Sequence, residues 1–117
     1  MTAPHVQEAL DRITRVGGVQ GAMLVAAADG LVVAESLMEG IPGPAAAALA
    51  ASLAQRCRLV VETAEAGGLR FLHLQAEEGT LVVVPMPGEL LLVALGSAEM
   101  NVGLARLEML KAAEVVG

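Results

Sequence analysis

Two almost uninterrupted apolar segments, Ala22–Ala28 and Leu31–Glu35, flank Asp29-Gly30 and constrain the fold more than any other feature of the chain. Asp-Gly between two apolar runs is a strong local signal for a β-hairpin, expected here with a two-residue type I′ turn. A sheet with one face in water has strands that alternate apolar and polar residues, and these two strands do not alternate. We therefore expect a sheet that helices cover on both faces.

Three segments have helical character. Residues 4–16 carry apolar side chains at the spacing of one helical face and end at Gly17-Gly18. The longest helix is expected from Pro44, after a Pro- and Gly-rich break, to about Thr63, and its first turns are almost pure alanine. The last helix follows Ser97, which suits an N-cap, and should pack on the sheet and on the first helix.

The middle helix has two faces of different character. One is a stripe with the spacing i, i+4, i+8 and i+11, formed by Leu49, Leu53, Cys57 and Val60, which we expect to pack on the sheet. The opposite face is polar apart from a leucine that is either an ordinary exposed side chain or part of a helix–helix contact. This second face contains Ser52, Gln55, Arg56, Leu59 and Glu62.

Three more strands are expected after Gly67-Gly68, over residues 69–75, 80–84 and 89–95, with turns at 76–79 and 85–88. Arg70 lies within an otherwise apolar strand, which suits the edge of a sheet. The whole chain, residues 1–117, then forms a single α+β domain with the order α-β-β-α-β-β-β-α. Two helices on one face of the sheet and one on the other would cover every apolar segment.

Composition limits the possible partners. The chain of 117 residues is 56% hydrophobic, so its excess apolar surface is expected to lie against a partner protein. A net charge of −6, with one lysine and one aromatic residue of the Phe, Tyr and Trp set, excludes the basic surface that nucleic-acid binding requires. No segment is suited to span a membrane, the N-terminus lacks the basic start of a secretory signal, and one cysteine fits a reducing cytoplasm.

Residues that could support enzymatic chemistry are sparse. His5, His73 and Cys57 do not form a metal-ligand set. No serine lies in a G-x-S-x-G motif, and the glycines at 17–21 are not followed by the lysine of a P-loop. Glu77-Glu78 falls in an expected turn rather than in a catalytic carboxylate pair. We therefore expect no enzyme activity, no cofactor and no metal.

The element order, the Ala-rich middle helix and two longer segments, Val19–Ser36 and Leu90–Lys111, resemble the roadblock/dynein light chain family. The most specific parts are Val-x-Gly-Ala before the Asp-Gly turn and the pattern Asn101-x-Gly103-x-x-Arg106. The resemblance extends over almost the whole chain, from about Val6 to Val115.

This resemblance implies a profilin-like fold, in which a five-stranded antiparallel sheet has the middle helix on one face and the two terminal helices on the other. It also implies a dimer, with itself or with a paralogue, whose third strands pair edge to edge and whose middle helices lie side by side. Family members are typically non-enzymatic platforms that bind and regulate small Ras-like GTPases, or adaptors in dynein and signalling complexes. Some GTPase-activating members carry a C-terminal extension that this chain lacks, which argues against direct activation.

We therefore expect a cytoplasmic, prokaryotic homodimer that binds and regulates a small Ras-like GTPase, as an activating partner or as a scaffold. One alternative is a dimeric assembly or adaptor subunit without GTPase contact. Another is a small-molecule sensor of the PAS or GAF type, which the scarcity of aromatic residues disfavours. The dimer interface is expected at Arg70, Phe71, Leu72, His73, Leu74 and Leu59, and the partner-binding surface at Ser52, Gln55, Arg56, Leu59 and Glu62.

Overall fold

The structure, a computed structural model, describes residues 4–116 and confirms the expected order of elements. All eight elements follow the α-β-β-α-β-β-β-α order expected from the sequence. They are α1 (Pro4–Thr14), β1 (Val19–Ala26), β2 (Val32–Leu37), α2 (Gly43–Thr63), β3 (Leu72–Gln75), β4 (Thr80–Met86), β5 (Leu90–Gly96) and α3 (Val102–Val116).

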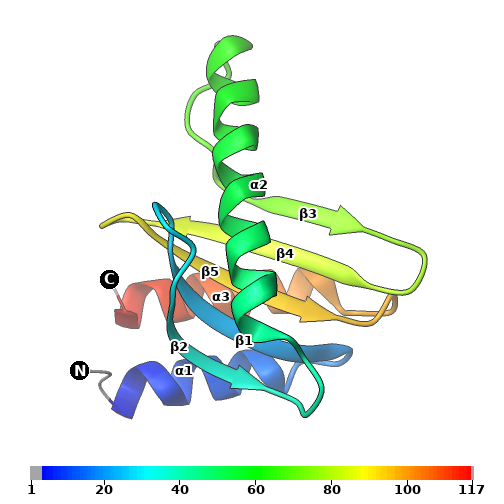
Figure 1. Cartoon of the computed structure of the whole chain (residues 1–117). Coiled ribbons are helices and arrows are strands. Elements are labelled where there is room, and N and C mark those ends of the chain that lie inside the picture. The colour runs from blue at the N-terminus through cyan, green and yellow to red at the C-terminus, as the bar shows by residue number, and fades with distance from the viewer. Residues whose placement is uncertain (1–3, 117) are drawn as a thin grey trace.

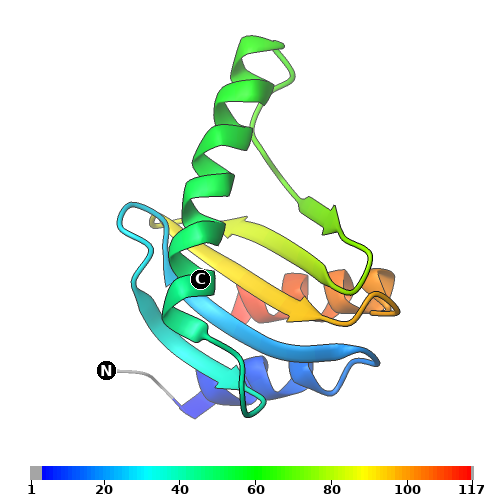
Figure 2. The same cartoon turned by 45° about the vertical axis from the view of Figure 1, so that its right-hand side comes forward.

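The strands form one antiparallel sheet in the order β2-β1-β5-β4-β3, so β2 and β3 are its two edges. Figure 1 shows α1 and α3 on one face and α2 on the other, as the family resemblance implied. Figure 2 shows that the second half of α2 extends beyond the sheet. The chain returns from the far end of this helix to form β3.

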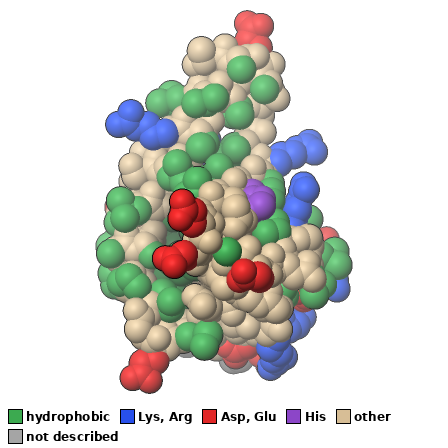
Figure 3. Space-filling view, turned by 90° about the vertical axis from the view of Figure 1, so that its right-hand side faces the viewer, with side chains coloured by type: hydrophobic (Ala, Val, Ile, Leu, Met, Phe, Trp, Pro, Cys, Tyr) green, Lys and Arg blue, Asp and Glu red, His purple; other side chains and the backbone are tan. Residues whose placement is uncertain are grey.

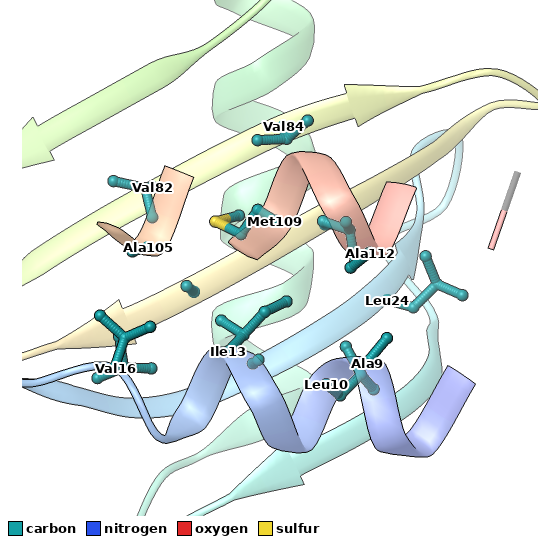
Figure 4. Close-up of a cluster of buried hydrophobic side chains, with 14 of the residues drawn as sticks. Ala9, Leu10, Ile13, Val16, Leu24, Val82, Val84, Ala105, Met109 and Ala112 are labelled. Carbon is teal, nitrogen blue, oxygen red and sulfur yellow. The ribbon is translucent and has the colours of Figure 1, made fainter. Parts of the chain in front are cut away.

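Each face of the sheet has its own hydrophobic core. On the side of α1 and α3, the side chains of Leu10, Ile13 and Met109 point toward the sheet and are at most 1% exposed (Figure 4). On the other side, Met23 and Leu91 are fully buried beneath α2. The central strands therefore carry apolar residues toward both helical layers, which confirms the prediction drawn from their lack of alternation.

The face of α2 that contacts the sheet consists of alanine, and the expected leucine stripe is not there. Long side chains from the sheet, such as those of Met23 and Leu91, fill the space below the helix, and small side chains let the helix backbone come close. Both stripes have the helical period, so periodicity alone could not separate them. Ala47, Ala50, Ala51 and Ala54 are 0–3% exposed, whereas Leu49 and Val60 are 71% and 65% exposed and Leu53 and Cys57 are half-buried.

The β1–β2 connection is longer than the expected two-residue type I′ turn. Only Gly30 has a positive φ, of 73°, and the Asp29 carboxylate accepts a hydrogen bond from the N–H of Leu31. The cause is Ala27, whose side chain is buried under α2 and whose N–H donates to the carbonyl of Glu89. Ala27 therefore belongs to the core, and the loop covers residues 27–31.

Strand β3 begins at Leu72 rather than at Leu69, because of a proline in the neighbouring strand. Leu72 pairs with Val83 on β4, and continuing this register by two residues would bring Arg70 opposite Pro85. Proline has no N–H to donate, so the ladder between β3 and β4 stops before it. Strand β4 itself continues past Pro85 to Met86, because Pro85 still pairs with β5.

The N-cap of α3 is Asn101 rather than the expected Ser97. The Asn101 side-chain oxygen accepts the N–H of Leu104 at 3.1 Å, which is a normal capping contact. Ser97 instead accepts the N–H of Glu99 in the turn before the helix.

Because α2 packs on the sheet through alanine, we expect larger side chains at these positions to destabilise the fold. Ala51→Leu should lower the free energy of unfolding by about 1–3 kcal/mol, because added methylenes cannot fit without moving α2. Ala45→Leu makes the same change at an exposed position of the same helix and should have little effect. Urea denaturation of both variants measures the difference, and equal losses would contradict the close-packing account.

Candidate functional site

The two edges of the sheet differ in their protection against further strand pairing. In β2, the register with β1 shifts at Leu24/Val25, which leaves a bulge at Val33. The backbone of Glu35 points away from β1, and its carbonyl accepts a hydrogen bond from the Gln7 side chain of α1 at 3.1 Å. A bulge and an occupied carbonyl both oppose the addition of another strand, so β2 is a blocked edge.

Strand β3 has neither device. The N–H of Ala76 donates to the carbonyl of Gly79, and antiparallel pairs alternate along a ladder, so Leu74 and Leu72 direct their backbone groups toward β4. His73 and Gln75 therefore direct their N–H and C=O groups to the open side of the strand. This edge presents a row of backbone donors and acceptors without a strand partner in the described part of the chain.

An apolar surface adjoins this open edge. The helix α2 lies over β1, β2 and β5, which leaves the same face of β3 and β4 less covered. Figure 3 looks at this side of the molecule and shows hydrophobic side chains running from the upper helix to the middle of the molecule. We call it the α2–β3 surface; it consists of Leu49, Leu53, Cys57 and Val60 of α2 and of Leu72, Leu74, Leu81 and Leu95 of the sheet.

The orientation of α2 assigns its flanks. The Gln55 side chain donates to the carbonyl of Ala27 at 3.1 Å, so this flank faces the β1–β2 loop. Figures 1 and 2 both show that loop and β3 on opposite sides of α2. Leu53 and Cys57 lie about 160° around the helix from Gln55 at about 100° per residue, and therefore on the flank toward β3.

The expected partner-binding residues form a second surface on α2, which borders the α2–β3 surface at Val60. Leu59 is 59% exposed and lies one turn beyond Gln55, on the flank that faces away from β3. Beside it, an open hollow of about 360 Å³ is lined by Leu59, Val60, Thr63 and Ala64. We call this the outer surface of α2; its expected members Ser52, Gln55, Arg56, Leu59 and Glu62 are all exposed or half-buried.

Of the expected dimer residues, the structure brings together those of the β3 segment but not Leu59. Leu72 is half-buried and Leu74 is 49% exposed, both on the α2 side of the sheet. Phe71 lies on the opposite side, where the Arg106 guanidinium stacks over its ring at 4.7 Å. The side chains of Arg70 and His73 are exposed.

The described residues present groups suited to association. Among residues 4–116, no three His, Cys, Asp or Glu side chains are grouped so that they could hold a metal ion. None of the helices in this range has the length and apolarity that crossing a membrane requires. What the α2–β3 side does present is unpaired strand backbone beside apolar side chains, which is the composition of a protein interface.

The fold and this edge define the class of protein. A profilin-like sheet with one long helix opposite two terminal helices and with an open third strand is the architecture of a roadblock domain. The chain belongs to the Roadblock/LC7 domain family, whose model matches residues 5–95.

The chain is also similar to individual proteins in sequence and in fold. The chain is 30% identical over 116 residues to the uncharacterized protein MJ0714 of Methanocaldococcus jannaschii, covering 99% of this chain and 97% of that protein. The fold is similar to a Roadblock/LC7 domain from Streptomyces avermitilis, with a TM-score of 0.84, 22% identity and coverage of 93% and 92% of the two chains. It is also similar to the gliding protein mglB of Thermus thermophilus, with a TM-score of 0.83, 20% identity and coverage of 97% and 89%.

Sequence reasoning missed the helical half of the α2–β3 surface because it assigned those residues to the core. A usable signal was present in the chain. Ala47, Ala51 and Ala54 follow at steps of four and three residues, and Leu49, Leu53 and Val60 at steps of four and seven, so both stripes repeat with the helical period and either could have packed on the sheet. The bulky strands beneath the helix favour the smaller one.

The exposure of the leucine stripe can be tested without a partner. In dilute protein, Leu49→Gln should change the free energy of unfolding by less than about 0.5 kcal/mol, because Leu49 is 71% exposed and glutamine is an equally good helix former. Leu91→Ala, at a position that is 0% exposed, should cost about 2–5 kcal/mol. A large loss of unfolding free energy in Leu49→Gln would show that this stripe packs in the core.

Proposed function

We propose that this chain is a non-enzymatic homodimeric platform that binds and regulates a small Ras-like GTPase. The observation that carries the dimer is the continuity of the open β3 edge with the exposed apolar stripe of α2. Pairing of β3 with β3 of a second copy satisfies the free backbone groups of both strands and joins the two sheets.

The same two-fold arrangement buries the apolar stripe. The stripe lies on the flank of α2 that faces β3, so a two-fold axis at β3 directs the stripes of both copies toward each other. Leu49 and Val60, which are 71% and 65% exposed in one chain, then gain a hydrophobic environment. Strand pairing and helix contact thus support one geometry.

Leu74→Glu tests this dimer. The substitution inserts charge into the apolar junction and should raise the dissociation constant by about two orders of magnitude, since each copy loses the burial of one leucine. Val33→Glu is a matched control, because Val33 is 48% exposed on β2 where Leu74 is 49% exposed on β3. Sedimentation equilibrium should give twice the 11.9 kDa chain mass for wild type and for Val33→Glu. A wild-type monomer at micromolar concentration would refute the dimer.

The GTPase part of the proposal rests on family membership and on the outer surface of α2. This surface combines an isolated apolar residue, Leu59, with charges of both signs at Arg56 and Glu62. In the proposed dimer, each outer surface lies on the flank of α2 away from the two-fold axis, so the dimer presents two symmetric patches, each with an apolar centre and a polar rim, as in modest protein interfaces.

Partner binding can be measured with the small Ras-like GTPases of the same genome, loaded with GDP or with a GTP analogue. The double variant Arg56→Glu, Leu59→Asp should weaken binding at least about tenfold, because it alters both the centre and the rim of the patch. Leu107→Asp, at a 49% exposed leucine of α3, is the matched control, and light scattering should show all three proteins dimeric.

If the double variant binds the GTPase with wild-type affinity, the GTPase binds another surface of the dimer. A stable dimer that binds none of these GTPases in either nucleotide state would instead favour the adaptor function without GTPase contact.

A further inference from the structure

The segment around β3 carries opposite charges at its two ends. Arg70 precedes the strand, and Glu77 and Glu78 form the turn that follows it, closed by the hydrogen bond from Ala76 to Gly79. All three charged side chains are exposed. The ion pair found in residues 4–116 joins Lys111 and Glu108 on α3, so none of these three charges has an ionic partner within that range.

We propose that this charge pattern selects a second copy of the same chain as the partner at β3, through ion pairs between Arg70 of each copy and Glu77 or Glu78 of the other. This inference rests on the dimer proposed above and specifies its partner. An antiparallel junction brings the beginning of one β3 next to the end of the other. The positive charge of Arg70 then lies near the negative charges of Glu77 and Glu78 at both ends of the junction.

The backbone geometry limits the register of such a junction. Only His73 and Gln75 direct their backbone groups outward, so residues of odd number pair with residues of odd number. Two registers are central on this four-residue strand, with His73 opposite either His73 or Gln75 of the partner subunit.

Both registers bring the opposite charges within reach. If His73 pairs with Gln75 of the partner subunit, Arg70, which lies two residues before the start of one β3, comes beside the turn of the partner subunit that holds Glu77 and Glu78. If His73 pairs with His73 of the partner subunit, Arg70 lies opposite Ala76 of the partner subunit. The turn that holds Glu77 and Glu78 then begins one residue further along the partner chain, which the long side chain of Arg70 can reach.

The overall charge gives these local pairs their importance. Each chain has a net charge of −6, so two copies repel each other at long range. A parallel junction would add repulsion between two arginines at one end and between four glutamates at the other. A paralogue without this pattern would lack both attractive ends. Exposed ion pairs contribute little affinity, so their effect is mainly on the choice of partner and register.

Two charge-reversed variants test the inference. Arg70→Glu makes both ends of β3 negative, and the double change Glu77→Arg, Glu78→Arg makes both ends positive. Each variant alone should dimerise at least about tenfold more weakly than wild type at low salt, since attraction becomes repulsion at two symmetric positions. Their equimolar mixture should form heterodimers well above the statistical half, as counted by native mass spectrometry.

Three further measurements make the result specific. The chain that carries all three substitutions is again self-complementary and should regain homodimerisation. Glu39→Arg changes the charge of an exposed residue in the loop after β2, at the opposite edge of the sheet, and should leave dimerisation unchanged. The defects of the two charge-reversed variants should shrink at 1 M salt, where the Debye length falls to about 3 Å.

The outcomes separate this inference from the dimer itself. If both charge-reversed variants dimerise as tightly as wild type and mix in a 1:2:1 ratio, the ion pairs are wrong and the dimer stands. If the two weak variants fail to restore each other in the mixture, the charges act through something other than the antiparallel junction, and the inference is overturned. A monomeric wild type would instead contradict the proposed dimer.

Discussion

The contact between α2 and the sheet through alanine is the constraint on which the rest of the structure depends. Four buried alanines bring the helix close to β1 and β5, and the same register turns Leu49 and Val60 outward. Had the leucines packed on the sheet, the helix would stand further away and its flank toward β3 would carry no apolar stripe. Packing of the alanine face on the sheet therefore determines both the core beneath α2 and the apolar stripe of the candidate interface.

The sheet edges add a second level of control. At β2, a bulge and the Gln7 side chain oppose strand addition, whereas at β3 the backbone of His73 and Gln75 is open. Because only one edge accepts a strand, an assembly formed through it closes after two chains and does not propagate into a fibre. In this domain one edge of the sheet is blocked and the other is open, so strand addition is limited to β3.

Much of the fold could be predicted from the chain, and rather less of the site. The order of elements, the sheet covered on two faces and the edge position of β3 followed from local patterns such as the non-alternating strands and Arg70 in an apolar run. The face of α2 could not be predicted, because alanine and leucine stripes share one period and only the size of the strand side chains separates them. The start of β3 depends on Pro85, which is distant from Arg70 along the chain and which only the register of the sheet brings opposite it.

Pro85 also affects how the choice of dimer partner can change during the evolution of such domains. By ending the β3–β4 ladder early, it leaves a strand of four residues and therefore few backbone hydrogen bonds for any partner strand. Backbone groups are the same in every chain and cannot distinguish one partner from another. The backbone therefore contributes only a small part of the binding energy. Side chains along β3 and α2 mainly determine which partner chain is bound. After gene duplication, a few substitutions along β3 and α2 would be enough to separate two lineages into self-pairing and cross-pairing subunits.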